Sequence, residues 1–93
     1  MNELGPDTKV KQSGDVITRE ISGQLVILTP AEGTIHELDE LGSFIWSLCA
    51  EPASLETITA SIVAEYDVES EVAAKDLAEF LAKLLDAGAV TKQ

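Results

Sequence analysis

The chain has 93 residues, of which seventeen are acidic and six are basic, so its formal net charge is −11. This length suits one small domain, and a hydrophobic fraction of 45% is too high for an intrinsically disordered chain. No apolar run approaches the roughly 20 residues that a membrane span requires. The first 14 residues contain no apolar stretch of the kind found in secretory signals. We therefore expect a cytoplasmic protein.

The charge distribution argues against direct binding to nucleic acid. Neutralising phosphates takes clustered lysine and arginine, whereas between Glu32 and Asp86 thirteen acidic residues are accompanied only by Lys75 and Lys83. The single cysteine, Cys49, and the single histidine, His36, exclude an internal disulfide and a multi-cysteine or two-histidine metal site within one chain. We expect no metal and no cofactor, with Cys49 in the core and His36 on a partly exposed strand.

The first half of the sequence predicts a flexible arm followed by three strands. Residues 1–14 are mostly polar, and we expect them to form a flexible N-terminal arm before a domain over residues 15–93. Strand-like segments cover Val16–Ile21, Gln24–Thr29 and Thr34–Leu38, with turn residues at 22–23 and 30–33. The second segment is continuously apolar, which predicts a central strand buried on both faces. Such short connections favour an antiparallel meander.

After Leu38 the hydrophobic period changes from two residues to 3.6, which predicts three helices. Asp39 is a good N-cap for the first helix, and Ser54 and Ser70 are suited to open the second and third. Gly88 stands where a helix-ending left-handed residue is expected. Trp46 lies beside the apolar stripe of the first helix and is expected in the core. Three strands followed by three helices predict an α+β domain.

This order of elements has a consequence for binding. The first and last strands of a three-stranded meander are both edges with unpaired backbone groups. The segment Thr34–Leu38 is therefore able to accept an extended peptide by strand addition. A long amphipathic helix beside this strand would complete a groove.

The segment from His36 to Trp46 reads His-Glu-Leu-Asp-Glu-Leu-Gly-Ser-Phe-Ile-Trp. It resembles the pattern L-[ND]-x-x-G-x-x-[IV]-W of proteins similar to pyrroloquinoline quinone biosynthesis protein D. The residues that match the pattern are Leu38, Asp39, Gly42, Ile45 and Trp46. The resemblance continues through the second and third helices and covers about residues 16–90.

The resemblance implies a winged-helix-like, non-catalytic domain of the kind called a RiPP recognition element. Such a domain binds the leader of a ribosomally made precursor peptide and presents the peptide to a maturation enzyme, for example a radical SAM protein. The leader lies as an added strand on the third strand, and its side chains rest on the third helix. Carried over to this chain, the peptide-binding residues are Thr34, Ile35, His36, Glu37, Leu38, Asp76, Leu77, Phe80, Leu81, Lys83 and Leu84. Many relatives have an aromatic pair near Ile35 and His36, so a mostly aliphatic leader pocket is expected in this chain.

Two other functions fit parts of the sequence. A small acidic carrier protein is one, although Ser43 lacks the aspartate that directly precedes the modified serine of carriers. A winged-helix regulator that binds another protein is the other; the net charge argues against a regulator that binds DNA. The charged residues Lys75, Asp76, Glu79 and Lys83 either form a solvated helix face or flank the groove, and the sequence leaves both interpretations open.

Overall fold

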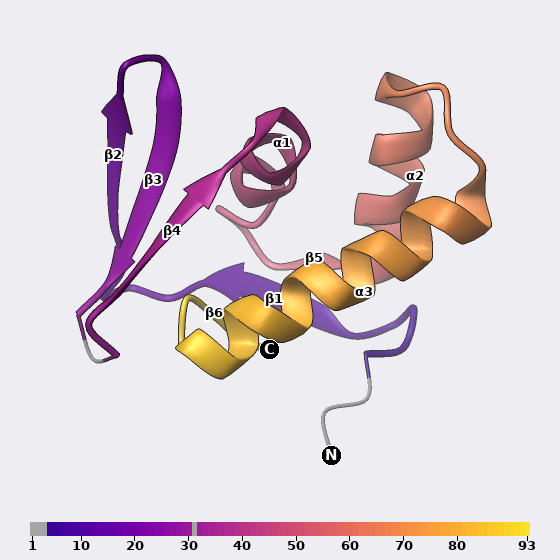
Figure 1. The fold of residues 1–93 in the computed structure, drawn as a ribbon. Helices are drawn as coiled ribbons and strands as arrows, with labels where there is room; N and C mark the ends of the chain where they lie inside the picture. The colour runs from indigo at the N-terminus through magenta and orange to yellow at the C-terminus, as the bar shows by residue number, and fades with distance from the viewer. Residues whose placement is uncertain (1–3, 31) are drawn as a thin grey trace.

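The computed structural model describes residues 4–30 and 32–93 (Figure 1). The helices are α1 (Glu40–Leu48), α2 (Leu55–Glu65) and α3 (Ser70–Ala87). The strands are β1 (Lys9–Gln12), β2 (Ile17–Ile21), β3 (Gln24–Thr29), β4 (Thr34–Leu38), β5 (Ala53–Ser54) and β6 (Val90–Lys92). Strands β2 to β4 precede the three helices, which confirms the predicted α+β, winged-helix-like fold. None of the helices in the described residues has the length and apolar content to cross a membrane.

Strands β2, β3 and β4 form the predicted antiparallel meander, with β3 in the centre. The predicted turn at Ser22 and Gly23 joins β2 to β3, whereas the turn at residues 30–33 includes residue 31, which lies outside the described residues. The prediction that β3 is buried on both faces is wrong. Ile27 is fully buried, but Val26 and Leu28 point to the opposite face and are only partly buried. This second face is not covered by a helix, and it carries exposed isoleucines on both neighbouring strands (Ile17, Ile21 and Ile35).

The helix ends follow local capping chemistry. Asp39 is the N-cap of α1, and its Oδ1 accepts a hydrogen bond of 2.8 Å from the Gly42 N–H. Ser54 caps α2 in the same way, with its Oγ 3.1 Å from the Thr57 nitrogen. For α3 the prediction is one residue off, because Glu69 holds the cap position and Ser70 is the first helical residue. Gly88 ends α3 with a φ of 80°, in the predicted left-handed conformation.

The predicted flexible arm is wrong for residues 9–12. These residues form β1, which pairs with β5 on one side and with β6 on the other, and Val10 is fully buried. The carbonyl oxygens of Pro6 and Thr8 also accept hydrogen bonds from the backbone nitrogens of Glu56 and Leu55, at the start of α2. The sequence gives a weak signal here, because β1 has one apolar residue and its partners are far along the chain. Residues 1–3 of the arm lie outside the described residues.

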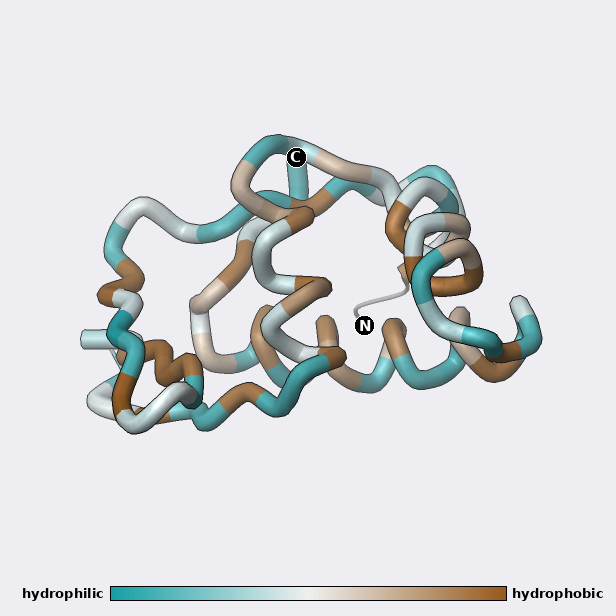
Figure 2. Tube along the Cα trace, turned by 90° about the horizontal axis from the view of Figure 1, so that it is seen from above, coloured by the Kyte–Doolittle hydropathy of each residue, from teal (hydrophilic) through white to brown (hydrophobic). Residues whose placement is uncertain are grey.

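A single cluster of buried side chains joins the two sheets and the three helices. Hydrophobic and hydrophilic residues alternate along the helices at the helical period (Figure 2), so each helix turns one stripe inward. The largest fully buried side chains are Ile27, Ile58, Leu77, Leu81, Leu84, Val10, Val90 and Cys49. Burial raises the pKa of the Cys49 thiol to about 11, so the thiol stays protonated at neutral pH and serves as core packing, as predicted.

Trp46 is 4% exposed, and its burial confirms the expected core position. We expect Trp46→Ala to lower the free energy of unfolding by about 3 kcal/mol or more, because it leaves a large cavity in a small core. Chemical denaturation followed by circular dichroism measures this loss. A loss below about 1 kcal/mol would show that the indole does not pack in the core in solution.

Val10 tests whether β1 belongs to the folded domain. We expect Val10→Ala to cost about 2 kcal/mol in the free energy of unfolding, because the side chain is fully buried between elements distant in sequence. Val72→Ala is the matched control, because the same side chain is 51% exposed there. Its effect should stay within about 0.5 kcal/mol. Equal effects of the two substitutions would contradict the burial of β1.

Candidate functional site

Strand β4 has one paired and one open edge within the described residues. It pairs with β3 in the register Leu25↔Leu38 to Thr29↔Thr34, and the strand order β2-β3-β4 leaves its other side without a strand. Alternate residues of an antiparallel strand direct their N–H and C=O groups to each side. The open edge of β4 therefore presents a row of backbone donors and acceptors at hydrogen-bonding spacing.

A groove runs between this edge and α3. Its volume is about 540 Å³, and we call it the β4–α3 groove. It is lined by Gln24, Ile35, His36, Glu37, Leu38, Asp39, Phe80, Lys83 and Leu84. The structure thus brings together the predicted site residues 35–38 of β4 with three of those predicted on α3. In this part of the molecule α3 lies beside the edge strand, as the sequence analysis expected.

Side chains of β4 alternate between the two faces of the sheet. His36 and Leu38 pair with Ile27 and Leu25 and face the core side, where Leu38 is buried. Ile35 and Glu37 face the other side, and Ile35 is 66% exposed. Side chains of both sets reach the groove, because β4 is the edge strand.

The remaining predicted residues lie in different surroundings. Thr34, at the start of β4, places its Oγ1 2.6 Å from Thr29 Oγ1 and 3.2 Å from His36 Nε2. Asp76 and Leu77 line a neighbouring cleft, and Leu77 is fully buried at its base. Leu81 is fully buried and lines neither the groove nor the neighbouring cleft, so the structure places it in the core.

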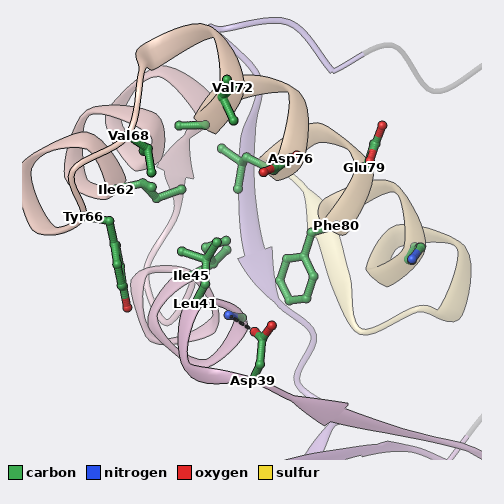
Figure 3. A pocket seen from close by; sticks show the side chains of 14 residues that line it. Asp39, Leu41, Ile45, Ile62, Tyr66, Val68, Val72, Asp76, Glu79 and Phe80 are labelled. Carbon is green, nitrogen blue, oxygen red and sulfur yellow. Dashed lines mark hydrogen bonds between the residues drawn. The ribbon is translucent and has the colours of Figure 1, made fainter.

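The neighbouring cleft lies between α1, the α2–α3 connection and α3, and we call it the α1–α3 cleft (Figure 3). Its volume is about 360 Å³. It is lined by Asp39, Leu41, Gly42, Ile45, Ile62, Tyr66, Val68, Val72, Ala73, Asp76, Leu77, Glu79, Phe80 and Lys83. The sequence analysis missed most of these residues as a site, because a helical stripe does not show which of its members line a cavity.

Phe80 stands between the groove and the cleft. It lines both, together with Asp39 and Lys83. A Cβ atom at Gly42 would lie 3.4 Å from Phe80 Cε1 and Cζ and 3.1 Å from Asp39 Oδ1. The absence of a side chain at Gly42 therefore lets the ring of Phe80 approach the first turn of α1 closely.

The charged residues of α3 divide between two faces. Asp76, Glu79 and Lys83 line the cleft, whereas Lys75 is exposed and lines neither the cleft nor the groove. Lys83 lines both cavities and is exposed, so the structure places this residue beside the groove, and its part in peptide selection stays a prediction.

Tyr66 lies at the α1 side of the cleft mouth and packs edge-on against Phe44, with ring centroids 5.6 Å apart. Partial desolvation of its hydroxyl and the carboxylates of Glu40, Glu65 and Asp39 raise the pKa of Tyr66 above its usual value. Three carboxylates thus act on one hydroxyl, so the potential at this end of the cleft is negative.

Within the described residues, no group of three histidine, cysteine or acidic side chains is placed to hold a metal ion.

Comparisons with known proteins agree with this geometry. A family model described as coenzyme PQQ synthesis protein D (PqqD) matches residues 24–90, which include the groove and the cleft. Among solved structures, the chain is similar to TbiB1 in complex with the TbiA(beta) leader peptide, with a TM-score of 0.77 and 36% sequence identity. This similarity covers 86% of this chain and 93% of TbiB1. No curated protein matches the chain. The match over most of its length shows that the chain belongs to the PqqD family.

Proposed function

We propose that this protein is a non-catalytic module that binds the leader of a ribosomally made precursor peptide and delivers the peptide to a modifying enzyme, such as a radical SAM protein. The observation that carries the proposal is the β4–α3 groove, in which an open strand edge runs beside an amphipathic helix. An extended peptide that adds to β4 would satisfy the open backbone groups of that strand and place alternate side chains against α3.

Two further findings support peptide binding. The chain belongs to the PqqD family, and TbiB1, to which it is 36% identical, has been solved with a leader peptide bound. The carrier alternative is less well supported, because the sheet formed by β2 to β4 precedes the helices and Ser43 lies in the first turn of α1 without a preceding aspartate. A regulator that binds another protein would use the same groove, and the titration described below separates it from a leader-binding module.

In the proposed mode of binding, affinity and selectivity come from different groups of the protein. Main-chain hydrogen bonds to β4 supply affinity for many sequences, whereas the side chains of the groove select among them. Binding the leader raises the effective concentration of the attached core peptide at the enzyme. The chain itself needs to supply no reacting group and no cofactor for this role. Since the proposed ligand is made on ribosomes, we place the protein in the cytoplasm.

Titration of the ¹⁵N-labelled protein with synthetic leader peptides, taken from precursor genes near its own gene, tests the proposal. We expect saturable shifts of backbone amide signals concentrated in β4 and in the part of α3 that lines the groove. Binding by strand addition also predicts that only every second backbone amide of the peptide forms a hydrogen bond with β4. N-methylation of every second peptide amide should weaken binding at least about tenfold, because each lost hydrogen bond costs about 1 kcal/mol and the methyl group obstructs pairing.

The matched control is N-methylation of the intervening amides, which point away from β4 and should change affinity much less. Equal effects at all positions would contradict strand addition. Shifts confined to other elements, with β4 unaffected, would place the peptide elsewhere. If no leader binds while a partner protein moves the β4 amides, the regulator alternative is correct.

A further inference from the structure

The α1–α3 cleft has an apolar base and a partly open mouth. Ile45, Ile62 and Leu77 form the base and are at most 2% exposed. Near the mouth, Val68 and Val72 are 39% and 51% exposed, although both line the cleft. Large apolar side chains left exposed around a concavity are typical of a binding site. The volume of about 360 Å³ is at the lower end of ligand sites, which suits a bulky side chain and its neighbours.

The rim of the cleft is acidic. Asp39, Asp76 and Glu79 contribute three carboxylates, and Lys83 is the only base among the lining residues. Figure 3 shows Asp39 on the α1 side of the cleft and Asp76 and Glu79 on the α3 side. The pKa of Tyr66 is raised by desolvation and by the carboxylates of Glu40, Glu65 and Asp39, of which only Asp39 lines the cleft. A side chain that brings a positive charge to this rim would therefore gain attraction that a neutral or acidic one lacks.

The groove and the cleft are adjacent, and Phe80 stands between them. Asp39, Phe80 and Lys83 line both, and Asp39 directly follows Leu38, the last residue of β4. A peptide strand paired with β4 therefore reaches the cleft where β4 ends. The peptide side chains that face α3 would enter the cleft and contact its apolar base, and the neighbouring peptide residues would lie beside the acidic rim.

We propose that the α1–α3 cleft selects leader peptides that carry a lysine or arginine beside the bulky apolar residue that fills the cleft. This inference rests on the proposed function and adds a chemical preference to it. The apolar residue is held by Ile45, Leu77 and Phe80, and the cation lies among the carboxylates of Asp39, Asp76 and Glu79. A second copy of this chain is a poorer occupant, because two molecules of net charge −11 repel each other.

A double-mutant cycle tests the inference. The probe is a fluorescent leader peptide that shifts the β4 amides, and its affinity is measured by fluorescence anisotropy. On the protein, Asp76→Asn with Glu79→Gln removes two rim charges. We expect this pair to weaken binding about three- to tenfold at low salt, which is the range for two partly exposed ion pairs. The difference should largely vanish at about 0.5 M salt, because of screening.

Asp86→Asn with Glu51→Gln is the control pair. It also removes two negative charges, but from exposed residues that line neither the groove nor the cleft, and Asp86 is on the same helix as the rim pair. Its effect should stay below about twofold. On the peptide, replacing each lysine or arginine in turn with glutamine should identify one position that matters. At that position, the glutamine substitution should no longer lower the affinity when Asp76 and Glu79 are already substituted on the protein.

The outcomes separate the two proposals. If the rim pair and the control pair bind the leader equally well while β4 amides still shift, the charge preference is wrong and leader binding stands. Tight binding of a leader without lysine or arginine, insensitive to the rim pair, also overturns the preference. If no leader moves the β4 amides, both proposals fail. Amide spectra of the variants, compared with that of the unsubstituted protein, show that the substitutions leave the fold intact.

Discussion

The burial of one stripe of α3 determines which residues of this helix line the groove and the cleft. Leu77, Leu81 and Leu84 are at most 2% exposed and belong to the same buried cluster as Ile27 and Leu38 of the sheet. Successive residues of a helix are separated by about 100°, so this stripe fixes the direction of its neighbours. Residues on the flank of the stripe, among them Asp76, Phe80 and Lys83, then line the cavities. The same helix thus fills the core and forms a wall of the groove.

This arrangement requires close packing at one point. Phe80 stands between the groove and the cleft, and a Cβ atom added at Gly42 would lie at van der Waals distance from its ring, 3.4 Å, and closer to Asp39 Oδ1, at 3.1 Å. Asp39 caps α1 through the same glycine and also lines both cavities. The first turn of α1 therefore serves both the helix cap and the wall of the cleft, because Asp39 and Gly42 form the capping hydrogen bond and also line the cleft.

Binding and selection are assigned to different chemical groups. The open edge of β4 offers backbone donors and acceptors, which differ little between peptide sequences. In the proposed mode of binding, the apolar base and acidic rim of the α1–α3 cleft would discriminate between side chains. Three of the chain's acidic residues line this cleft, whereas most of the others lie on exposed surface elsewhere.

The sequence alone determined the elements whose signals are local. The capping residues Asp39 and Ser54, the turn at Ser22 and Gly23, and the end of α3 at Gly88 all follow from chemistry within a few positions. The bounds of β3 and β4, and with them the candidate edge strand, also followed from hydrophobic pattern and turn residues. The family resemblance came from the same segment.

Only the tertiary structure decided the features that depend on contacts between distant segments. The sequence predicts a flexible arm where β1 forms, because its single valine gives no pattern without its partners β5 and β6. The sequence also predicts burial of both faces of β3, because apolar composition does not show whether a second layer covers a strand. The assignment of Leu81 to the core and of Glu79 to the cleft needed the rotation of α3, which depends on packing against all the other elements. A sequence encodes the stripe of a helix, but the cavity beside that stripe exists only after the neighbouring elements are in place.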